Sequence, residues 1–195
     1  MTRTFRIAAL TIATTLLAGC GINAIPTYDE QVKAAWSEVL NQYQRRSDLV
    51  PNLVETVKGF AAQEQAVFAE VTEARARVGQ MQLPADVLSN PEAFKAFQQQ
   101  QQALGGALTR LLAVAEAYPE LKSNANFLAL QSQLEGTENR IAVARGDYIT
   151  AVQQYNTELR TIPGRWWAAL MYSDAKVRET FTIEEQAKEV PKVGF

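Results

Sequence analysis

A single heptad frame of apolar residues runs from Asp29 to Val78, and it restricts the chain to long helices packed side by side. Its two rows, four residues apart, share one helix face and form one apolar stripe. The rows are Val32, Val39, Arg46, Leu53, Phe60, Val67 and Ala74, and Trp36, Tyr43, Val50, Val57, Glu64, Val71 and Val78. Because so long a stripe must be covered by other long helices, the sequence predicts an all-α bundle.

Pro51 falls inside this first helix, which we expect to begin with Asp29 as its N-cap. A proline within a helix removes a hydrogen-bond donor and crowds the carbonyl four residues earlier, at a cost of about 3 kcal/mol. Ser47 and Asp48 are able to cap a new helix after a break. The apolar frame continues in phase beyond the proline, however, and this favours a kinked helix over a broken one.

The second helix has a strong start signal after Gly79, which ends the first pattern. Asn90 is a good N-cap, and Pro91 suits the first helical position. Pro119 stops this helix. We therefore expect a helix from Pro91 to just before Pro119.

The third helix is predicted to begin within residues 123–126 and to end at Pro163. Its heptad row is Phe127, Leu134, Ile141, Tyr148, Tyr155 and Ile162. A short fourth helix with concentrated aromatic residues follows and reaches Tyr172. The remaining polar tail, residues 173–195, is expected to be poorly ordered. The bundle thus contains about four helices, the first very long and the fourth short.

The N-terminus carries Arg3 and Arg6, an apolar run over residues 7–17, and then Ala18-Gly19-Cys20. The run is about half the roughly 20 residues needed to cross a bilayer. This segment resembles a bacterial lipoprotein signal. Such signals are cleaved before the cysteine, which carries a diacylglycerol on sulfur and an acyl chain on its new amino terminus.

The lipoprotein resemblance divides the N-terminal region into a signal peptide, residues 1–19, and a lipidated tether, residues 20–28. Several acyl chains on Cys20 would hold the chain stably at a membrane surface, on the extracytoplasmic face. Gly21 stands where an aspartate would retain such a protein in the inner membrane. The expected location is therefore the outer membrane, if the cell has one.

Composition excludes several functions. The chain has 19 basic and 21 acidic residues, and without the two leader arginines the count is 17 against 21, or about −4. This charge disfavours nucleic-acid binding. With no histidine and one cysteine, the chain cannot build a Ser-His-Asp or Cys-His triad, or a histidine or multi-cysteine metal site. We expect no cofactor and no metal.

Four segments together resemble the LemA family of bacterial membrane-associated proteins: AWSEVLNQYQRRSDLVPNLVETVKGFAAQE, LEGTENRIAVARGDYITAVQQYN, IPGRWWAAL and VPKVGF. The resemblance implies an antiparallel bundle of long helices, here residues 29–172, behind an N-terminal membrane segment. It implies no known catalytic activity. The sequence departs from the family pattern twice. A lipobox ending at Cys20 replaces the usual transmembrane helix, and Ile149 replaces a common asparagine.

Four charged residues lie on or beside the apolar seams: Arg46, Glu64, Glu138 and Arg145. Because an unpaired charge there would be very costly, we predict that they form a buried ion network that sets helix register. In particular, we expect Arg46 and Glu138 to face each other. The alternative is a catalytic carboxylate site, but a packed seam has no room for a substrate. Di-iron bundles need Glu-x-x-His pairs, which this chain lacks.

Arg165, Trp166 and Trp167 make an aromatic segment that suits lipid headgroups or a partner protein. The alternative is that the two tryptophans cap the open end of the bundle.

These features favour a lipid-anchored scaffold or adaptor of the cell envelope that binds envelope proteins and is not an enzyme. No small-molecule substrate is expected. Two alternatives stay open: an envelope hydrolase that uses Glu64 or Glu138, and a periplasmic sensor domain of a membrane complex.

Overall fold

The computed structural model describes residues 21–182 and, over that range, contains helices and loops but no strand. The elements in chain order are α2 (Ala24–Lys58), α3 (Gln65–Gln80), the 3₁₀ turn η1 (Val87–Ser89), α4 (Pro91–Glu116), α5 (Pro119–Lys122), α6 (Ala125–Arg160) and α7 (Gly164–Met171). The predicted all-α fold is confirmed.

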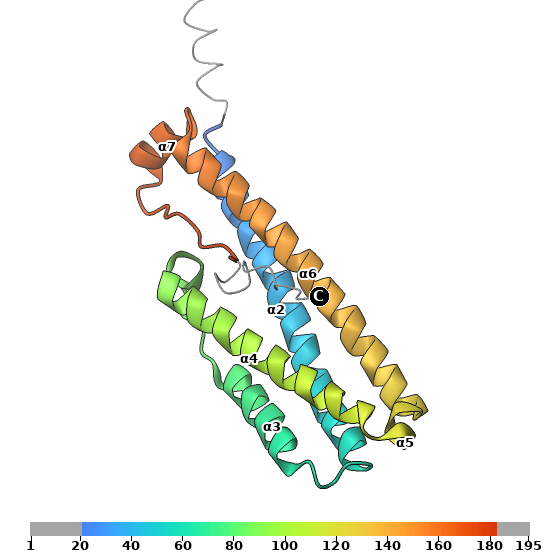
Figure 1. Cartoon of the computed structure of the whole chain (residues 1–195). Helices are drawn as coiled ribbons and strands as arrows, with labels where there is room; N and C mark the ends of the chain where they lie inside the picture. Colours follow the sequence, from blue (N-terminus) through green and yellow to red (C-terminus); the bar gives the residue numbers. More distant parts are fainter. Residues whose placement is uncertain (1–20, 183–195) are drawn as a thin grey trace, which may run out of the picture.

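The two longest helices, α2 and α6, lie side by side and run in opposite directions (Figure 1). Helices α3 and α4 pack against each other and cover the half of α2 that is distant from α7. The short α7 lies across the other end, beside the start of α2. The bundle is therefore antiparallel and elongated.

The predicted single helix over residues 29–78 is wrong, because the chain reverses after Lys58. Gly59 is the C-cap of α2, and α3 begins only at Gln65. The buried side chains of α3 join the same core cluster as the last buried residues of α2. The heptad frame therefore predicted correctly which faces of α2 and α3 are buried. It did not predict that α3 runs back along α2.

The start of α2 also differs from the prediction. The helix begins at Ala24, with Asn23 at the N-cap position, so residues 24–28 of the predicted tether are helical. Asp29 is not a cap. Its carboxylate lies inside the first turns of the helix and pairs with Lys33 and Arg178.

Helix α2 runs through Pro51 without a break, as the apolar frame predicted. Pro51 has no N–H to donate to the carbonyl of Ser47, four residues earlier. Arg75 on α3 donates to this carbonyl instead, with Nε 3.1 Å from the oxygen. A side chain of the neighbouring helix thus satisfies the acceptor that the proline leaves open.

The other helix starts agree with the sequence analysis. Asn90 accepts a hydrogen bond from the Ala93 amide at 3.2 Å, and Asn124 accepts one from the Phe127 amide at 3.1 Å. These are N-caps of α4 and α6. Helix α7 spans Gly164–Met171, where the fourth helix was predicted.

The core has two apolar clusters with a polar layer between them. The first cluster fills the half of the bundle that carries α7, and it includes the rings of Trp36, Phe94, Tyr148 and Phe181. The second fills the other half of the bundle with residues of α2, α3, α4 and α6. On three helices the residues between the clusters are buried and polar: Arg46 and Ser47 on α2, Gln101 on α4, and Thr137 on α6.

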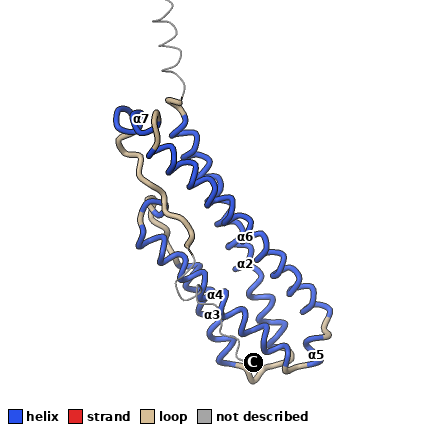
Figure 2. Tube along the Cα trace, turned by 45° about the horizontal axis from the view of Figure 1, so that its top comes forward, coloured by secondary structure: helices blue, strands red, loops and turns tan. Residues whose placement is uncertain are grey.

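The polar tail is ordered against the bundle as far as it is described, so the prediction of poor order is wrong for residues 173–182. Figure 2 shows the loop that leaves α7 running back toward α4. Phe181 is buried in the aromatic cluster, and the Glu179 carbonyl accepts a hydrogen bond from the Tyr148 hydroxyl at 2.8 Å. The side-chain amide of Asn156 accepts a hydrogen bond from the main-chain N–H of Arg178 and donates one to its carbonyl. Residues 183–195 lie outside the described range.

Candidate functional site

The polar layer is built around the guanidinium of Arg46. Its Nη1 lies 3.2 Å from Glu138 Oε1 on α6. Its Nη2 donates to the carbonyl and to the side-chain oxygen of Gln101 on α4, at 2.9 and 2.7 Å. The Arg46 side chain is 5% exposed and that of Glu138 45% exposed. The structure therefore brings the predicted pair together at the edge of the core, with the cation inside and the carboxylate at the surface.

The other two predicted members do not join this ion pair. Glu64 sits in the turn between α2 and α3, where it accepts a hydrogen bond from the Tyr118 hydroxyl at 2.9 Å. This bond to a carboxylate raises the pKa of Tyr118. The guanidinium of Arg145 lies 4.4 Å from the ring centre of Phe181 and makes a cation–π contact. The four-residue network is thus corrected to Arg46 with Glu138, joined by Gln101.

The reason for this correction is the chain reversal and the ordered tail. Glu64 was placed on the same continuous helix as Arg46, but the chain reverses after Lys58 and Glu64 lies in the turn at the far end of the bundle. Arg145 follows Glu138 by one heptad and meets the tail residue Phe181 instead of the carboxylate. Gln101 was missed because it lies in a glutamine run that suggests a solvated helix face, although its side chain is buried.

The arrangement of carboxylates bears on catalysis and metal binding. Glu64 and Glu138 bond to different partners on different elements, so they do not form the acid and base pair that a hydrolase needs. Within residues 21–182, no group of three His, Cys, Asp or Glu side chains is placed to hold a metal ion.

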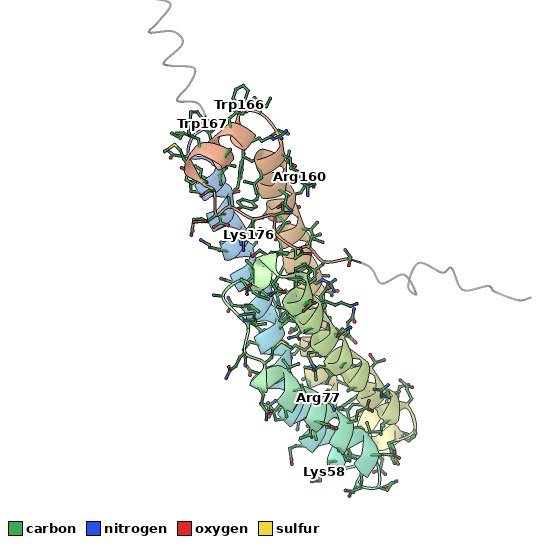
Figure 3. The ribbon with its side chains drawn as sticks, turned by 90° about the vertical axis from the view of Figure 1, so that its left-hand side faces the viewer. Lys58, Arg77, Arg160, Trp166, Trp167 and Lys176 are labelled. Carbon is green, nitrogen blue, oxygen red and sulfur yellow. The ribbon has the colours of Figure 1, made fainter. Side chains whose placement is uncertain are left out.

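The second candidate site is the end of the bundle that carries α7. Figure 3 shows Trp166 and Trp167 at the end opposite Lys58. Trp167 is half-buried and packs against the first apolar core cluster, so it does cap the bundle. Trp166 is 63% exposed and points outward, and Arg165 is exposed beside it. Trp167 therefore takes the capping position, and Trp166 leaves an exposed aromatic surface at this end.

The first described residues, Gly21 and Ile22, lie beside α7. A Cβ placed on Gly21, whose φ is +100°, would lie 3.5 Å from Pro163 Cγ and 4.0 Å from Trp167 Nε1. The Tyr172 hydroxyl donates to the carbonyl of Ile22 at 3.0 Å. Cys20 lies outside the described residues, but it immediately precedes Gly21. The N-terminal segment thus enters the fold beside α7.

Sequence reasoning missed three exposed apolar residues around Trp166. Ile162 was assigned to the heptad row of the third helix, yet α6 ends at Arg160 and Ile162 is 63% exposed. Leu170 and Met171 are 77% and 55% exposed. Trp166 and Leu170 are four residues apart on α7, and this spacing is the signal that could have placed them on one exposed helix face.

None of the helices described is both long enough and apolar enough to span a membrane.

Comparison with known proteins agrees with the resemblance seen in the sequence motifs. The chain is 28% identical over 185 residues to magnetosome proteins MamQ 1 and MamQ 2 of Paramagnetospirillum magneticum, covering 87% of this chain and 67% of each relative. It is 26% identical to magnetosome protein MamQ of Magnetospirillum gryphiswaldense, with the same coverage. The LemA family model matches residues 35–195, which include the helices from most of α2 onward and both candidate sites. The chain therefore belongs to the LemA family.

Proposed function

We propose that this protein is a lipid-anchored scaffold or adaptor of the bacterial cell envelope with no catalysis of its own. The observation that carries the proposal is the position of Gly21 beside Pro163 and Trp167 at one end of an elongated bundle. A lipid on Cys20 would hold that end at the membrane. Helix α6, with 36 residues, would then extend roughly 50 Å away from the anchor. A long body fixed at one end suits a protein that presents its sides to partners.

The lipid anchor itself is proposed from the sequence. Leu17, Ala18, Gly19 and Cys20 match a lipobox, and the preceding apolar run is too short to span a bilayer. The similarity to magnetosome proteins supports a membrane setting. Gly21 directs the proposal to the extracytoplasmic face and, in a cell with two membranes, to the outer one.

A role without catalysis is supported by the geometry of the two carboxylates on which a hydrolase would depend. Glu138 is paired with the buried Arg46, and Glu64 accepts from Tyr118 in a different part of the bundle. A structural role explains why Arg46 is buried between helices. Its bonds to Gln101 and Glu138 would hold α2, α4 and α6 in one alignment.

The anchor is tested by expressing the full chain in a bacterial host and comparing it with Cys20→Ser. We expect the wild type to lose residues 1–19 and to carry the mass of a diacylglycerol and an acyl chain on its N-terminal peptide. The variant should accumulate as the unprocessed precursor. A wild type of unmodified mass, with normal processing of Cys20→Ser, would refute lipidation.

The adaptor role is tested by photo-cross-linking in intact cells. p-Benzoylphenylalanine at Leu128 or Val143, exposed apolar positions on α6 at 49% and 64%, should give discrete adducts with envelope proteins. The same probe at buried Leu134 is the control for nonspecific adducts. If the probes at the two exposed positions yield no more adducts than the buried one, the sides of the bundle do not bind partners.

A further inference from the structure

We infer that the outward face of α7 lies in the interfacial layer of the bilayer that holds the N-terminal anchor. This inference rests on the proposed function, since it takes the segment before Gly21 to be held in a membrane. We define the α7 face by three exposed apolar residues of α7, Trp166, Leu170 and Met171, together with the exposed Ile162 just before the helix.

The α7 face is unusual because α7 is apolar on both sides. Its inner side, with Trp167 and Ala168, packs on the first apolar core cluster. Its outer residues expose 55–77% of their surface. A helix that is apolar all round is normally covered on every side, and a contiguous exposed apolar patch marks an interaction surface. The inner side is covered by the bundle, so the outer side needs a second apolar environment.

The position of the N-terminal segment identifies that environment as a lipid bilayer. Gly21 lies against Pro163 and Trp167, so an acylated Cys20 would enter the membrane directly beside α7. Tyr172 fixes this arrangement through its hydrogen bond to the Ile22 carbonyl. The anchor therefore brings the α7 face to the lipid surface without any movement of the bundle.

The residue types on and around α7 also fit the interfacial layer. Tryptophan prefers the boundary between headgroups and acyl chains, and leucine, isoleucine and methionine suit the region just below. Arg160 and Arg165 are exposed near the face and favour anionic headgroups. Two carboxylates are near in sequence, the exposed Asp174 and the half-buried Glu158. With eight residues, α7 is too short to span the bilayer, so it would lie in its plane.

The test uses the fluorescence of Trp166 in the full chain reconstituted into phosphatidylethanolamine and phosphatidylglycerol vesicles. Part of the lipid carries bromine on the acyl chains, which quenches tryptophans that enter the bilayer. Trp36 is buried in the core, and Trp167 is half-buried, so the difference between the wild type and Trp166→Phe isolates the signal of Trp166. We expect this difference signal to be quenched and shifted to shorter wavelength.

Two variants make the test specific. Leu128→Trp in the Trp166→Phe background places a tryptophan at a 49% exposed site near the opposite end of α6, and it should stay unquenched. Leu170→Asp changes the most exposed residue of the α7 face and should weaken the quenching of Trp166 while leaving helical circular dichroism unchanged.

The outcomes are distinct. An unquenched Trp166 in vesicle-bound protein overturns the inference, and this includes the case in which a second copy or another protein covers α7. Equal quenching of Trp166 and Leu128→Trp overturns it too, because the bundle would then lie flat on the membrane. Failure of lipidation is read separately from the mass of the N-terminal peptide. A chain held by an uncleaved leader still presents α7 to the brominated lipid.

Discussion

Arg75 Nε lies 3.1 Å from the main-chain carbonyl oxygen of Ser47, the acceptor that Pro51 leaves without its helical donor. Ser47 is buried, so this carbonyl has little access to water. An unsatisfied buried acceptor costs about 1–3 kcal/mol. The contact between α3 and α2 thus compensates for the backbone hydrogen bond that Pro51 removes from α2.

This relationship predicts coupling between Arg75 and Pro51. Arg75→Met should lower the free energy of unfolding by about 1–3 kcal/mol in the wild type. The loss should be smaller in a Pro51→Ala background, where the alanine N–H can bond to Ser47. Urea unfolding of the four proteins measures the difference.

Arg77→Met is the matched control for Arg75, since Arg77 makes only an exposed ion pair with Glu73 on the same helix. Its effect should stay within about 0.5 kcal/mol. If Arg75→Met is equally damaging with and without Pro51, the hydrogen bond does not compensate for the proline.

The sequence predicted helix starts and buried faces well because both depend on local chemistry. Asn90 and Asn124 cap their helices through hydrogen bonds within three residues. The reversal after Lys58 was not predictable from the apolar frame. A heptad pattern states which face of a helix is buried, and α3 buries its face in the same cluster as α2. Pro51 also gave a stronger local signal for a break than Gly59 did.

The candidate sites likewise contain some contacts that the sequence predicts and others that depend on tertiary structure. The pairing of Arg46 with Glu138 was predictable, because each charge lies on or beside an apolar row and needs a partner. The partners of Arg145 and Glu64 depend on the tail and on the chain reversal, which are tertiary features. Phe181 gave no periodic signal, since it lies in a polar segment outside any helix.

The Arg46 and Glu138 pair should show a coupling energy in a double-mutant cycle. Glu138→Leu leaves the buried Arg46 guanidinium with Gln101 and the Tyr43 ring but no counter-charge, and we expect a loss of about 1.5–3 kcal/mol. Arg46→Met leaves the buried Gln101 side chain without its donor and should cost about 1–3 kcal/mol. The double variant should be milder than the sum of the two.

Thermal and urea unfolding of these variants test whether Arg46 and Glu138 interact. Losses that add within about 0.5 kcal/mol would show that the two residues act independently. Glu135→Leu is a suitable control because Glu135 is an exposed carboxylate of α6 that bonds only to Gln131 on the same helix.

The ion pair between Asp29 and Arg178 should make the attachment of the tail depend on acid pH. Arg178 Nε and Nη2 lie 3.1 and 2.5 Å from Asp29 Oδ1. Burial alone raises the pKa of Asp29, but the hydrogen bonds from Lys33 and Arg178 outweigh it and lower the pKa below its ordinary value. The stabilisation is therefore complete above the unfolded pKa of about 3.9 and is lost as pH falls through the lower folded value.

Asp29→Asn tests this dependence. We expect the variant to be less stable than the wild type at neutral pH, by about 1–2 kcal/mol, and the difference to shrink below about pH 4. Urea unfolding across this pH range measures it, and hydrogen exchange of the Arg178 amide reports on the tail. Glu30→Gln is the control, because Glu30 pairs only with Lys33 at an exposed site. A stability difference that is constant down to pH 2 would contradict the proposed role of Asp29.

The last prediction concerns Gly164, where α7 turns closely against the end of α6. A Cβ on Gly164 would lie 2.8 Å from Glu158 Cδ and closer still to the Glu158 carbonyl, so Gly164→Ala must displace α7 or the last turn of α6. We expect a loss of about 1–3 kcal/mol, as for overpacking elsewhere. Gly146→Ala is the opposite case. Nothing lies within 4 Å of a Cβ there, and alanine inside α6 should add about 0.4–1 kcal/mol. Urea unfolding compares the two, and a Gly164→Ala variant as stable as Gly146→Ala would show that α7 does not need this close approach.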